Sequence, residues 1–137
     1  MLFYKLYSHK QVNVNIQDYI IDWNDAPSKS QQILQDFLYS YWKNKVILSE
    51  FRIPGSLLRA DIMNITDKIY LEYSPECTHD YSPHFHGNRL NFIKRIKNDM
   101  NKMQWAERNG FKTVEIIEKD LDYLSRKYFL EKFDILL

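Results

Sequence analysis

Three short segments in the middle of the chain carry the residue types of β-strands. They are residues 45–55 (KVILSEFRIPG), 57–65 (LLRADIMNI) and 68–75 (KIYLEYSP), and each is rich in β-branched or aromatic side chains and bounded by Gly, Pro, Asn or Asp. Thr66 and Asp67, with Lys68, supply turn residues between the second and third segments. The pattern predicts a meander of three antiparallel strands.

A helical repeat of apolar positions precedes this meander. Pro27 with Ser28 or Ser30 predicts the start of the helix, and we expect the helix to back the sheet. Its predicted apolar face consists of Ile33, Leu34, Phe37, Leu38 and Tyr41.

A second helix is predicted after the meander. A polar loop broken by proline covers 75–87, Asn88 is the expected N-cap, and Gly110 ends the helix. The expected apolar face consists of Ile93, Ile96, Met100 and Met103. A neighbouring face carries Arg95, Asp99 and Lys102, which we expect to point at a site on the sheet.

The rest of the chain completes an α/β pattern. Residues 111–117 (FKTVEII) predict a strand, and Asp120 is the expected start of a last amphipathic helix with Leu121, Leu124 and Tyr128. The 137 residues fit one domain. We divide it into an N-terminal extension of uncertain form (1–27), a core (28–121) and a C-terminal helix (122–137). The expected fold is α/β, with a mixed central sheet flanked by helices in the order αβββαβ plus one helix.

Composition adds the expected location. The hydrophobic share of 45% predicts a folded globule, and no stretch is apolar for the roughly 18 residues that a membrane span needs. The first residues, MLFYKLYSHK, lack the apolar centre of a signal peptide, and the single cysteine, Cys77, cannot form an internal disulfide. We therefore expect a cytoplasmic protein without a membrane partner. Trp42 and Trp105 are expected in the core.

Charge is distributed unevenly although the formal net charge is only +1. Between residues 86 and 112 there are seven basic and two acidic side chains, a local balance of +5, whereas the remainder sums to −4. Such a basic helix suits the binding of a polyanion such as nucleic acid. The alternative is a solvated helix face without a ligand.

Three acidic residues mark the candidate chemistry, because Glu50, Asp61 and Glu72 each lie on one of the three predicted strands. Asp61 and Glu72 fall nearly opposite each other, where facing residues of an antiparallel pair are roughly 5 Å apart. Two such carboxylates repel each other unless a cation compensates them, and Mg²⁺ prefers oxygen ligands of this kind. The alternative is that all three are ordinary charges on the polar face of a sheet.

The run from Ser30 through Leu121 resembles the PD-(D/E)XK nuclease superfamily. Within it the chain is most similar to the phage-type branch of very short patch repair and EDxHD homing endonucleases. The stretches that carry the resemblance are SEFRIP, LLRADIMNI, IYLEYSPECTHD, PHFHGNRLNF and NDMNKMQWAERNGFKTVEI. The resemblance implies a restriction-endonuclease-like core and a metal-dependent endonuclease that cuts DNA, encoded by a phage or mobile element.

The chain departs from the motif that names the superfamily. A lysine usually stands two residues after the second carboxylate, and here that position is Ser74. In the related phage nucleases the role of this lysine is taken by a histidine in the next loop and an acidic residue on the next helix. His79 and Asp99 fit these roles best, with His84 and His86 as alternatives and Lys102 as a source of positive charge from the helix.

The resemblance and the residue types together give a set of expected roles. Asp61, Glu72 and Glu50, with the Tyr73 carbonyl, are the expected ligands of Mg²⁺ or Mn²⁺. Glu50 alternatively forms an ion pair with Arg52 or Arg59. The expected catalytic residues are Glu50, Asp61, Glu72, His79, Asp99 and Lys102. The expected substrate-binding residues are Arg59, His84, His86, Lys94, Arg95 and Lys97, with Arg59 alternatively only an ion-pair partner.

The sequence is also compatible with other functions and ligands. Cys77, His79, His84 and His86 are close enough in sequence to hold structural zinc, although C-x-H-x4-H-x-H is not a common zinc pattern. Ser74 is also compatible with an inactive relic that binds DNA or a protein without cutting. RNA is a further possible substrate. With one domain and little room for a DNA-reading module, specificity is expected to come from loops, a homodimer or an accessory protein.

Overall fold

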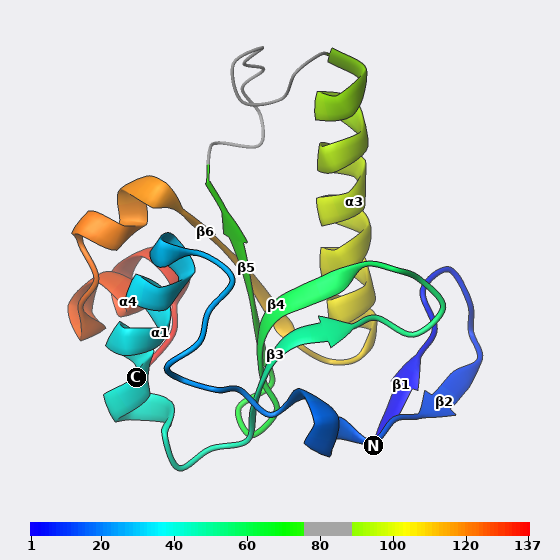
Figure 1. Cartoon of the computed structure of the whole chain (residues 1–137), viewed down its shortest axis with the longest axis horizontal. Coiled ribbons are helices and arrows are strands. Elements are labelled where there is room, and N and C mark those ends of the chain that lie inside the picture. Colours follow the sequence, from blue (N-terminus) through cyan, green and yellow to red (C-terminus); the bar gives the residue numbers. More distant parts are fainter. Residues whose placement is uncertain (76–88) are drawn as a thin grey trace.

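The computed structural model describes residues 1–75 and 89–137. Within these ranges a four-stranded sheet, in the order β3-β4-β5-β6, lies between helices (Figure 1). The strands are β3 (Ile47–Arg52), β4 (Arg59–Asn64), β5 (Ile69–Ser74) and β6 (Lys112–Ile117). Helices α1 (Lys29–Trp42) and α4 (Arg126–Phe133) cover one face, and α3 (Arg89–Arg108) stands on the other.

This architecture confirms the predicted α/β fold with a mixed sheet and the element order αβββαβ. The strands β3, β4 and β5 form an antiparallel meander, and β6 pairs in parallel with β5 after the crossover through α3. The predicted turn between β4 and β5 is present, and the Asn64 side chain closes it by accepting a hydrogen bond from the Asp67 N–H at 2.8 Å. The predicted loop from residue 76 onward and the Asn88 cap lie outside the described residues.

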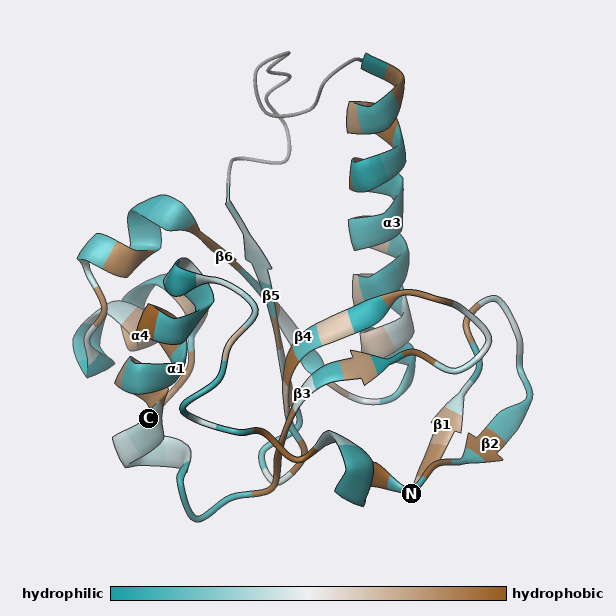
Figure 2. Cartoon of the chain, in the orientation of Figure 1, coloured by the Kyte–Doolittle hydropathy of each residue, from teal (hydrophilic) through white to brown (hydrophobic). Residues whose placement is uncertain are grey.

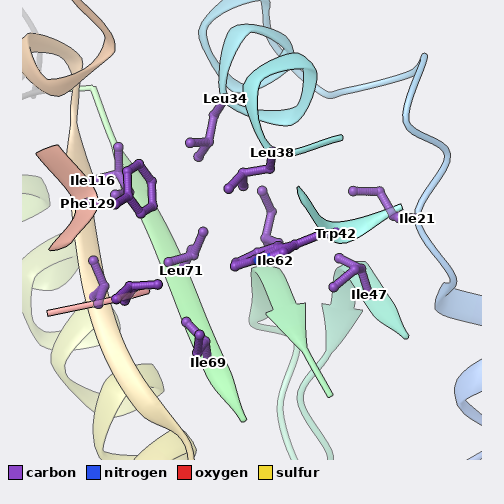
Figure 3. Close-up of a cluster of buried hydrophobic side chains, with 12 residues drawn as sticks. Ile21, Leu34, Leu38, Trp42, Ile47, Ile62, Ile69, Leu71, Ile116 and Phe129 are labelled. Atoms are coloured by element: carbon purple, nitrogen blue, oxygen red, sulfur yellow. The ribbon is translucent and has the colours of Figure 1, made fainter. Parts of the chain in front are cut away.

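Two hydrophobic clusters fill the spaces on the two faces of the sheet. Figure 3 shows the first, in which Leu34 and Leu38 of α1 point toward Ile62 and Leu71 of the strands, and Phe129 of α4 lies beside Ile116. The second cluster, on the α3 face, includes Phe51, Tyr70 and Trp105. Trp42 and Trp105 are each only 1% exposed, so both are core residues as expected. In Figure 2 the exposed length of α3 is mainly hydrophilic.

Helix α1 begins as predicted and buries most of its predicted face, since Leu34 and Leu38 belong to the first cluster and Phe37 and Tyr41 pack against it. Ser28 is its N-cap and accepts a hydrogen bond from the Gln31 N–H at 3.1 Å. Ile33 is 49% exposed, so its predicted place on the core face is wrong. The buried positions recur every three or four residues and are Gln31, Leu34, Gln35, Leu38 and Trp42. A wide apolar arc leaves the direction of packing open, and the sheet contacts the stripe that ends at Trp42.

Helix α3 buries only part of its predicted apolar face, in which Met103 packs against the second cluster. Ile93 is 50% and Met100 is 56% exposed, whereas the buried positions are Phe92, Lys102, Trp105 and Ala106. The buried stripe therefore contains a lysine, since it faces buried acidic groups of the sheet. The expected trio is divided, with Lys102 buried, Asp99 half-buried and Arg95 exposed.

The C-terminal helix starts later than predicted. Residues Glu118–Asp122 form a 3-10 helix, η2, and α4 begins at Arg126 behind an N-cap at Ser125. The fully buried carboxylate of Asp120 accepts hydrogen bonds from the Ile117 N–H at 2.8 Å, the Tyr128 hydroxyl and the Lys132 ammonium. Asp120 thus joins η2 to α4 instead of starting the helix.

The N-terminal residues form part of the same domain. Strands β1 (Leu2–Tyr4) and β2 (Gln11–Asn13) make an antiparallel hairpin, and η1 (Ile16–Tyr19) follows it. The ring of Phe3 lies 4.9 Å from that of Phe51, and the Trp105 indole donates a hydrogen bond to the Tyr4 carbonyl at 2.6 Å. The hairpin therefore completes the cluster beneath α3. Across the described ranges, every helix is too short or too polar to span a bilayer.

Candidate active site

The three acidic residues singled out from the sequence lie on three adjacent strands. Glu50 is on β3, Asp61 on β4 and Glu72 on β5. The last pair in the β4–β5 register is Ile62 with Leu71, so the next positions along the two strands are Asp61 and Glu72. Because directly opposite residues project to the same face, the strand register places both carboxylates on one face of the sheet.

The β3–β4 ladder is distorted at this level. Ser49 pairs with Ile62 and Phe51 with Ala60, whereas Glu50 between them has a left-handed backbone with φ of 49°. Leu48 and Phe51 contact the same cluster although they are three residues apart, whereas regular strands place residues two apart on one face. The side-chain alternation therefore shifts by one residue next to Asp61.

Asp61 uses its side chain to bind the neighbouring strand. Its Oδ2 accepts a hydrogen bond from the Tyr73 N–H of β5 at 2.8 Å. This bond takes up a backbone donor beyond the last paired residues, Ile62 and Leu71. The carboxylate is thereby fixed in orientation at the open end of the β4–β5 ladder.

Glu72 is held by groups from two elements. The residue is only 3% exposed. Its Oε1 accepts a hydrogen bond from the Lys102 ammonium of α3 at 2.5 Å. The other oxygen, Oε2, accepts a hydrogen bond from the Tyr70 hydroxyl. The same ammonium donates to the Arg59 carbonyl at 3.1 Å and lies 3.8 Å from Oδ1 of Asp99. Lys102 thus joins α3 to β4 and β5 at the level of the two acids.

Burial and mutual repulsion shift the titration of this cluster. Burial raises the pKa of Asp61 to about 6, against the opposing effect of the Lys102 charge. Burial, followed by the charge of Asp61, raises the pKa of Glu72 to about 8. The nearby carboxylates raise the pKa of Lys102 although burial alone would lower it, so the ammonium stays charged. The buried Glu72 and the half-buried Asp61 therefore share one fixed cation, and a further positive charge would be stabilised beside them.

The donor groups suit a hard divalent cation. Asp61 and Glu72 supply carboxylate oxygens from adjacent strands, and such oxygens are the preferred ligands of Mg²⁺. In residues 1–75 and 89–137 no three His, Cys, Asp or Glu side chains gather as a metal-binding group. Glu50 lines a neighbouring pocket of about 330 Å³ together with Ser49 and Asp18. Of the three expected ligands, Asp61 and Glu72 therefore lie together, whereas Glu50 lines a separate pocket on the adjacent strand β3.

Only some of the residues that were expected to act with these acids lie in the described ranges. His79, His84, His86 and Cys77 lie outside the described residues, and so does the possible zinc site. Asp99 lies beside Lys102, as the helix spacing predicted. The expected ion pair of Glu50 with Arg52 or Arg59 is not found among the described residues; the Arg52 side chain donates to the Ser56 carbonyl instead.

A groove leads from the cluster along α3. It encloses about 360 Å³ and is lined by Leu58 and by Asn91, Lys94, Arg95, Asn98, Asp99 and Lys102. Lys94, Arg95 and Lys97 are exposed on the helix, and the Arg59 side chain is exposed on β4. The basic residues expected to bind substrate therefore lie on the two elements that border the cluster.

Two residues next to Glu72 were not identified from the sequence as part of the site. Tyr70 donates to Glu72 and is itself fully buried, and its position two residues before Glu72 on the same strand was the available signal. Glu115 of β6 is the register partner of Glu72 in the parallel pair, so a third acidic position adjoins the site. No sequence signal identified it, because the pairing of β6 with β5 was not known.

Comparison of the chain with protein-family models, with curated proteins and with solved structures returned no match.

Proposed function

We propose that this chain is a metal-dependent endonuclease that hydrolyses phosphodiester bonds in DNA. The observation that carries the proposal is the placement of two acids on adjacent strands, the half-buried Asp61 and the buried Glu72, beside the Lys102 ammonium. Structural surface charges do not require this arrangement, whereas a site for a divalent cation does. The resemblance to the phage-type nucleases supports the same activity and a cytoplasmic place of action.

In this proposal Asp61 and Glu72 hold Mg²⁺ or Mn²⁺, with the Tyr73 carbonyl and Glu50 of the adjacent strand as further oxygen ligands. The ion, when bound, polarises the phosphate and lowers the pKa of the attacking water. The chain orients its ligands through neighbours, since the Tyr73 N–H fixes Asp61 and the Tyr70 hydroxyl fixes Glu72. These outer contacts set the direction of the carboxylate oxygens.

Lys102 has two proposed tasks. Its ammonium contacts Glu72 and lies 3.8 Å from Asp99, so it holds the Glu72 carboxyl group in place and favours its ionised form against the effect of burial. It also supplies positive charge at the inner end of the groove, where charge would develop on the phosphate during hydrolysis. Lys102 would thereby provide from α3 the charge that the motif lysine, replaced here by Ser74, supplies in the superfamily. His79 is the proposed proton acceptor, with Asp99 to orient it.

The basic face of α3 is the proposed contact with the rest of the DNA. Lys94, Arg95 and Lys97 are exposed there, and each cationic side chain that neutralises a phosphate releases counterions. Binding is therefore expected to weaken steeply with salt. Arg59, exposed on β4 next to the groove residue Leu58, is proposed to add positive charge on the strand side.

Nicking of supercoiled plasmid tests the activity. Wild-type protein is incubated with Mg²⁺ or Mn²⁺ and, in parallel, with EDTA, beside the variants Asp61→Asn and Glu72→Gln. Asp122→Asn and Glu118→Gln are matched controls, since both residues are exposed and lie outside the cluster. We expect metal-dependent nicking that is lost in the site variants and kept in the controls.

Calorimetric titration with Mn²⁺ distinguishes an active nuclease from an inactive relic. The proposal expects binding by the wild type that Asp61→Asn weakens at least ten-fold. Absence of both nicking and metal binding in a folded wild-type protein would overturn the proposal and favour a relic that only binds nucleic acid or protein. Metal-dependent cutting of RNA but not DNA would correct the substrate class.

A further inference from the structure

One face of α3 beside the cluster carries polar side chains that do not belong to the metal site. Asn91, Lys94, Arg95 and Asn98 occur at intervals of three and four residues, so they lie on one side of the helix. All four line the groove that ends at Lys102. Exposure falls along it, from the exposed Asn91, Lys94 and Arg95 to the half-buried Asn98 and the buried Lys102. The face therefore leads from solvent to the proposed catalytic residues.

The side-chain types on this face match the edges of DNA bases. An asparagine amide donates and accepts at once and pairs with adenine in the major groove, whereas arginine and lysine pair with guanine or with phosphate. Asparagine amides also donate to phosphate oxygens, but on this face only the amides can both donate to and accept from the edge of one base. Two amides among the cations therefore allow reading of bases in addition to binding of the backbone.

The dimensions agree with a helix lying in the major groove. Asn91 and Asn98 are seven residues apart, which corresponds to about 10 Å along a helix axis, or roughly three base pairs of DNA. Asn98 is four residues from Lys102, which adds about 6 Å, or roughly two base pairs. In Figure 1 the first turns of α3 extend beyond the strands of the sheet, and Asn91, Lys94 and Arg95 are exposed there.

We propose that α3 enters the major groove of duplex DNA and that Asn91 and Asn98 read base edges two to five base pairs from the cleaved bond. Lys94 contacts a phosphate beside them, and Arg95 contacts a base or a phosphate. This inference rests on the proposed nuclease function for the position of the cut, but not for the reading itself. The one domain would then carry its own sequence preference.

Selection of binding sites tests the reading without cleavage. Full-length Asp61→Asn protein is used in EDTA to select from a library of random duplexes, and the selected pool is sequenced. The selection is repeated with Asn91→Ala and Asn98→Ala added separately. Asn44→Ala is the control, because Asn44 is exposed in the connection that follows α1, outside the groove. We expect preferred bases at positions about three base pairs apart, with about a ten-fold preference lost at one position in each groove variant.

Salt dependence separates reading from phosphate binding. Affinity for the selected duplex is measured by fluorescence anisotropy over a range of salt concentrations. Lys94→Ala is expected to weaken binding to all sequences alike and to lower the slope of log affinity against log salt by about one. Lys127→Ala, at an exposed position on α4, should leave the slope unchanged. Thermal unfolding followed by circular dichroism confirms that each variant is folded.

The possible outcomes distinguish the two proposals. Selected sequences without preference, or a preference unchanged in both asparagine variants, would overturn the reading by α3 even if the wild type cuts DNA. A preference lost in those variants supports the reading even if wild-type protein cuts nothing, and in that case the nuclease function fails by itself. Failure of the folded protein to bind duplex DNA at low salt would overturn the inference.

Discussion

The Lys102 ammonium and the Glu72 carboxylate are 2.5 Å apart although the residues are 30 positions apart in the chain. Glu72 is in β5, the last strand of the meander, and Lys102 is in the second turn from the end of α3. The contact closes the space between β5 and α3, with Tyr70 on the other carboxylate oxygen. The stability of this region and the chemistry of the site therefore depend on the same pair.

The coupling between the two charges can be measured. Lys102→Met leaves the Glu72 carboxylate buried without its cation, and loss of one partner of a buried pair costs about 3–5 kcal/mol. In the double variant Lys102→Met with Glu72→Gln, we expect a loss of stability smaller than the sum of the single losses. Urea unfolding of the four proteins gives the coupling free energy. Additive losses would contradict the paired arrangement, whereas plasmid nicking should be absent from all three variants.

Tyr70 should influence catalysis through the orientation of Glu72. Tyr70→Phe removes the hydroxyl that donates to Oε2 and keeps the buried ring, so we expect a stability loss of about 1 kcal/mol. If Glu72 is a metal ligand, the same change should lower Mn²⁺ affinity by roughly ten-fold, as loss of an outer contact does. Tyr19→Phe, at a half-buried tyrosine in edge contact with Phe51, is the control. Unchanged Mn²⁺ affinity in a protein whose Asp61→Asn variant does lose it would show that the hydroxyl has only a structural task.

The buried carboxyl group of Asp120 should make the stability of the protein depend on pH in the acidic range. Burial alone raises the pKa of its carboxyl, but hydrogen bonds from Lys132, Tyr128 and the Ile117 N–H outweigh burial and lower it. A lowered pKa in the folded state stabilises the protein above the unfolded value of about 4, and this stabilisation is lost as the pH falls through the folded value. Asp120→Asn should therefore cost about 1–3 kcal/mol at neutral pH. The difference from wild type, measured by urea unfolding, should shrink below about pH 4; a constant difference would contradict the charge effect.

The ammonium group of Lys132 should make the stability depend on pH in the alkaline range. Its hydrogen bond to Asp120 raises the pKa of the ammonium. The stabilisation is then present below the unfolded value of about 10.4 and is lost as the pH rises through the folded value. The wild-type protein should approach Lys132→Met in stability only above that range.

The orientation of α1 can be tested by two neighbouring substitutions. Leu34 is fully buried against the sheet, so Leu34→Ala should cost about 2–5 kcal/mol. Ile33 is 49% exposed, and Ile33→Ala should stay within about 1 kcal/mol of wild type. Urea unfolding with an unchanged slope checks both values. Similar losses at the two positions would mean that α1 buries the wider face predicted from the sequence.

The sequence by itself determined the elements and the positions of the acids within them. Alternation of strand-type residues identified β3, β4 and β5, and the turn after Asn64 aligned Asp61 with Glu72. These are local properties, because strand residues, turn residues and helix caps depend on the backbone conformation of a few neighbours. Ser28 and Gly110 were readable for the same reason, as a helix N-cap and as a residue with φ of 84° after a helix.

Only the tertiary structure decided which side of each helix is buried. The apolar arcs of α1 and α3 are wider than the stripes that contact the sheet, so Ile33, Ile93 and Met100 remain exposed while Lys102 is buried. Packing against distant strands selects one direction within such an arc, and a lysine is accepted there because Glu72 compensates its charge. The parallel pairing of Glu115 beside Glu72 likewise depends on the strand order, which residues far apart in the chain establish together. The candidate site was thus visible as acids on strands with Lys102 on the following helix, but the contacts that Lys102 and Tyr70 make with Glu72 are seen only in the folded structure.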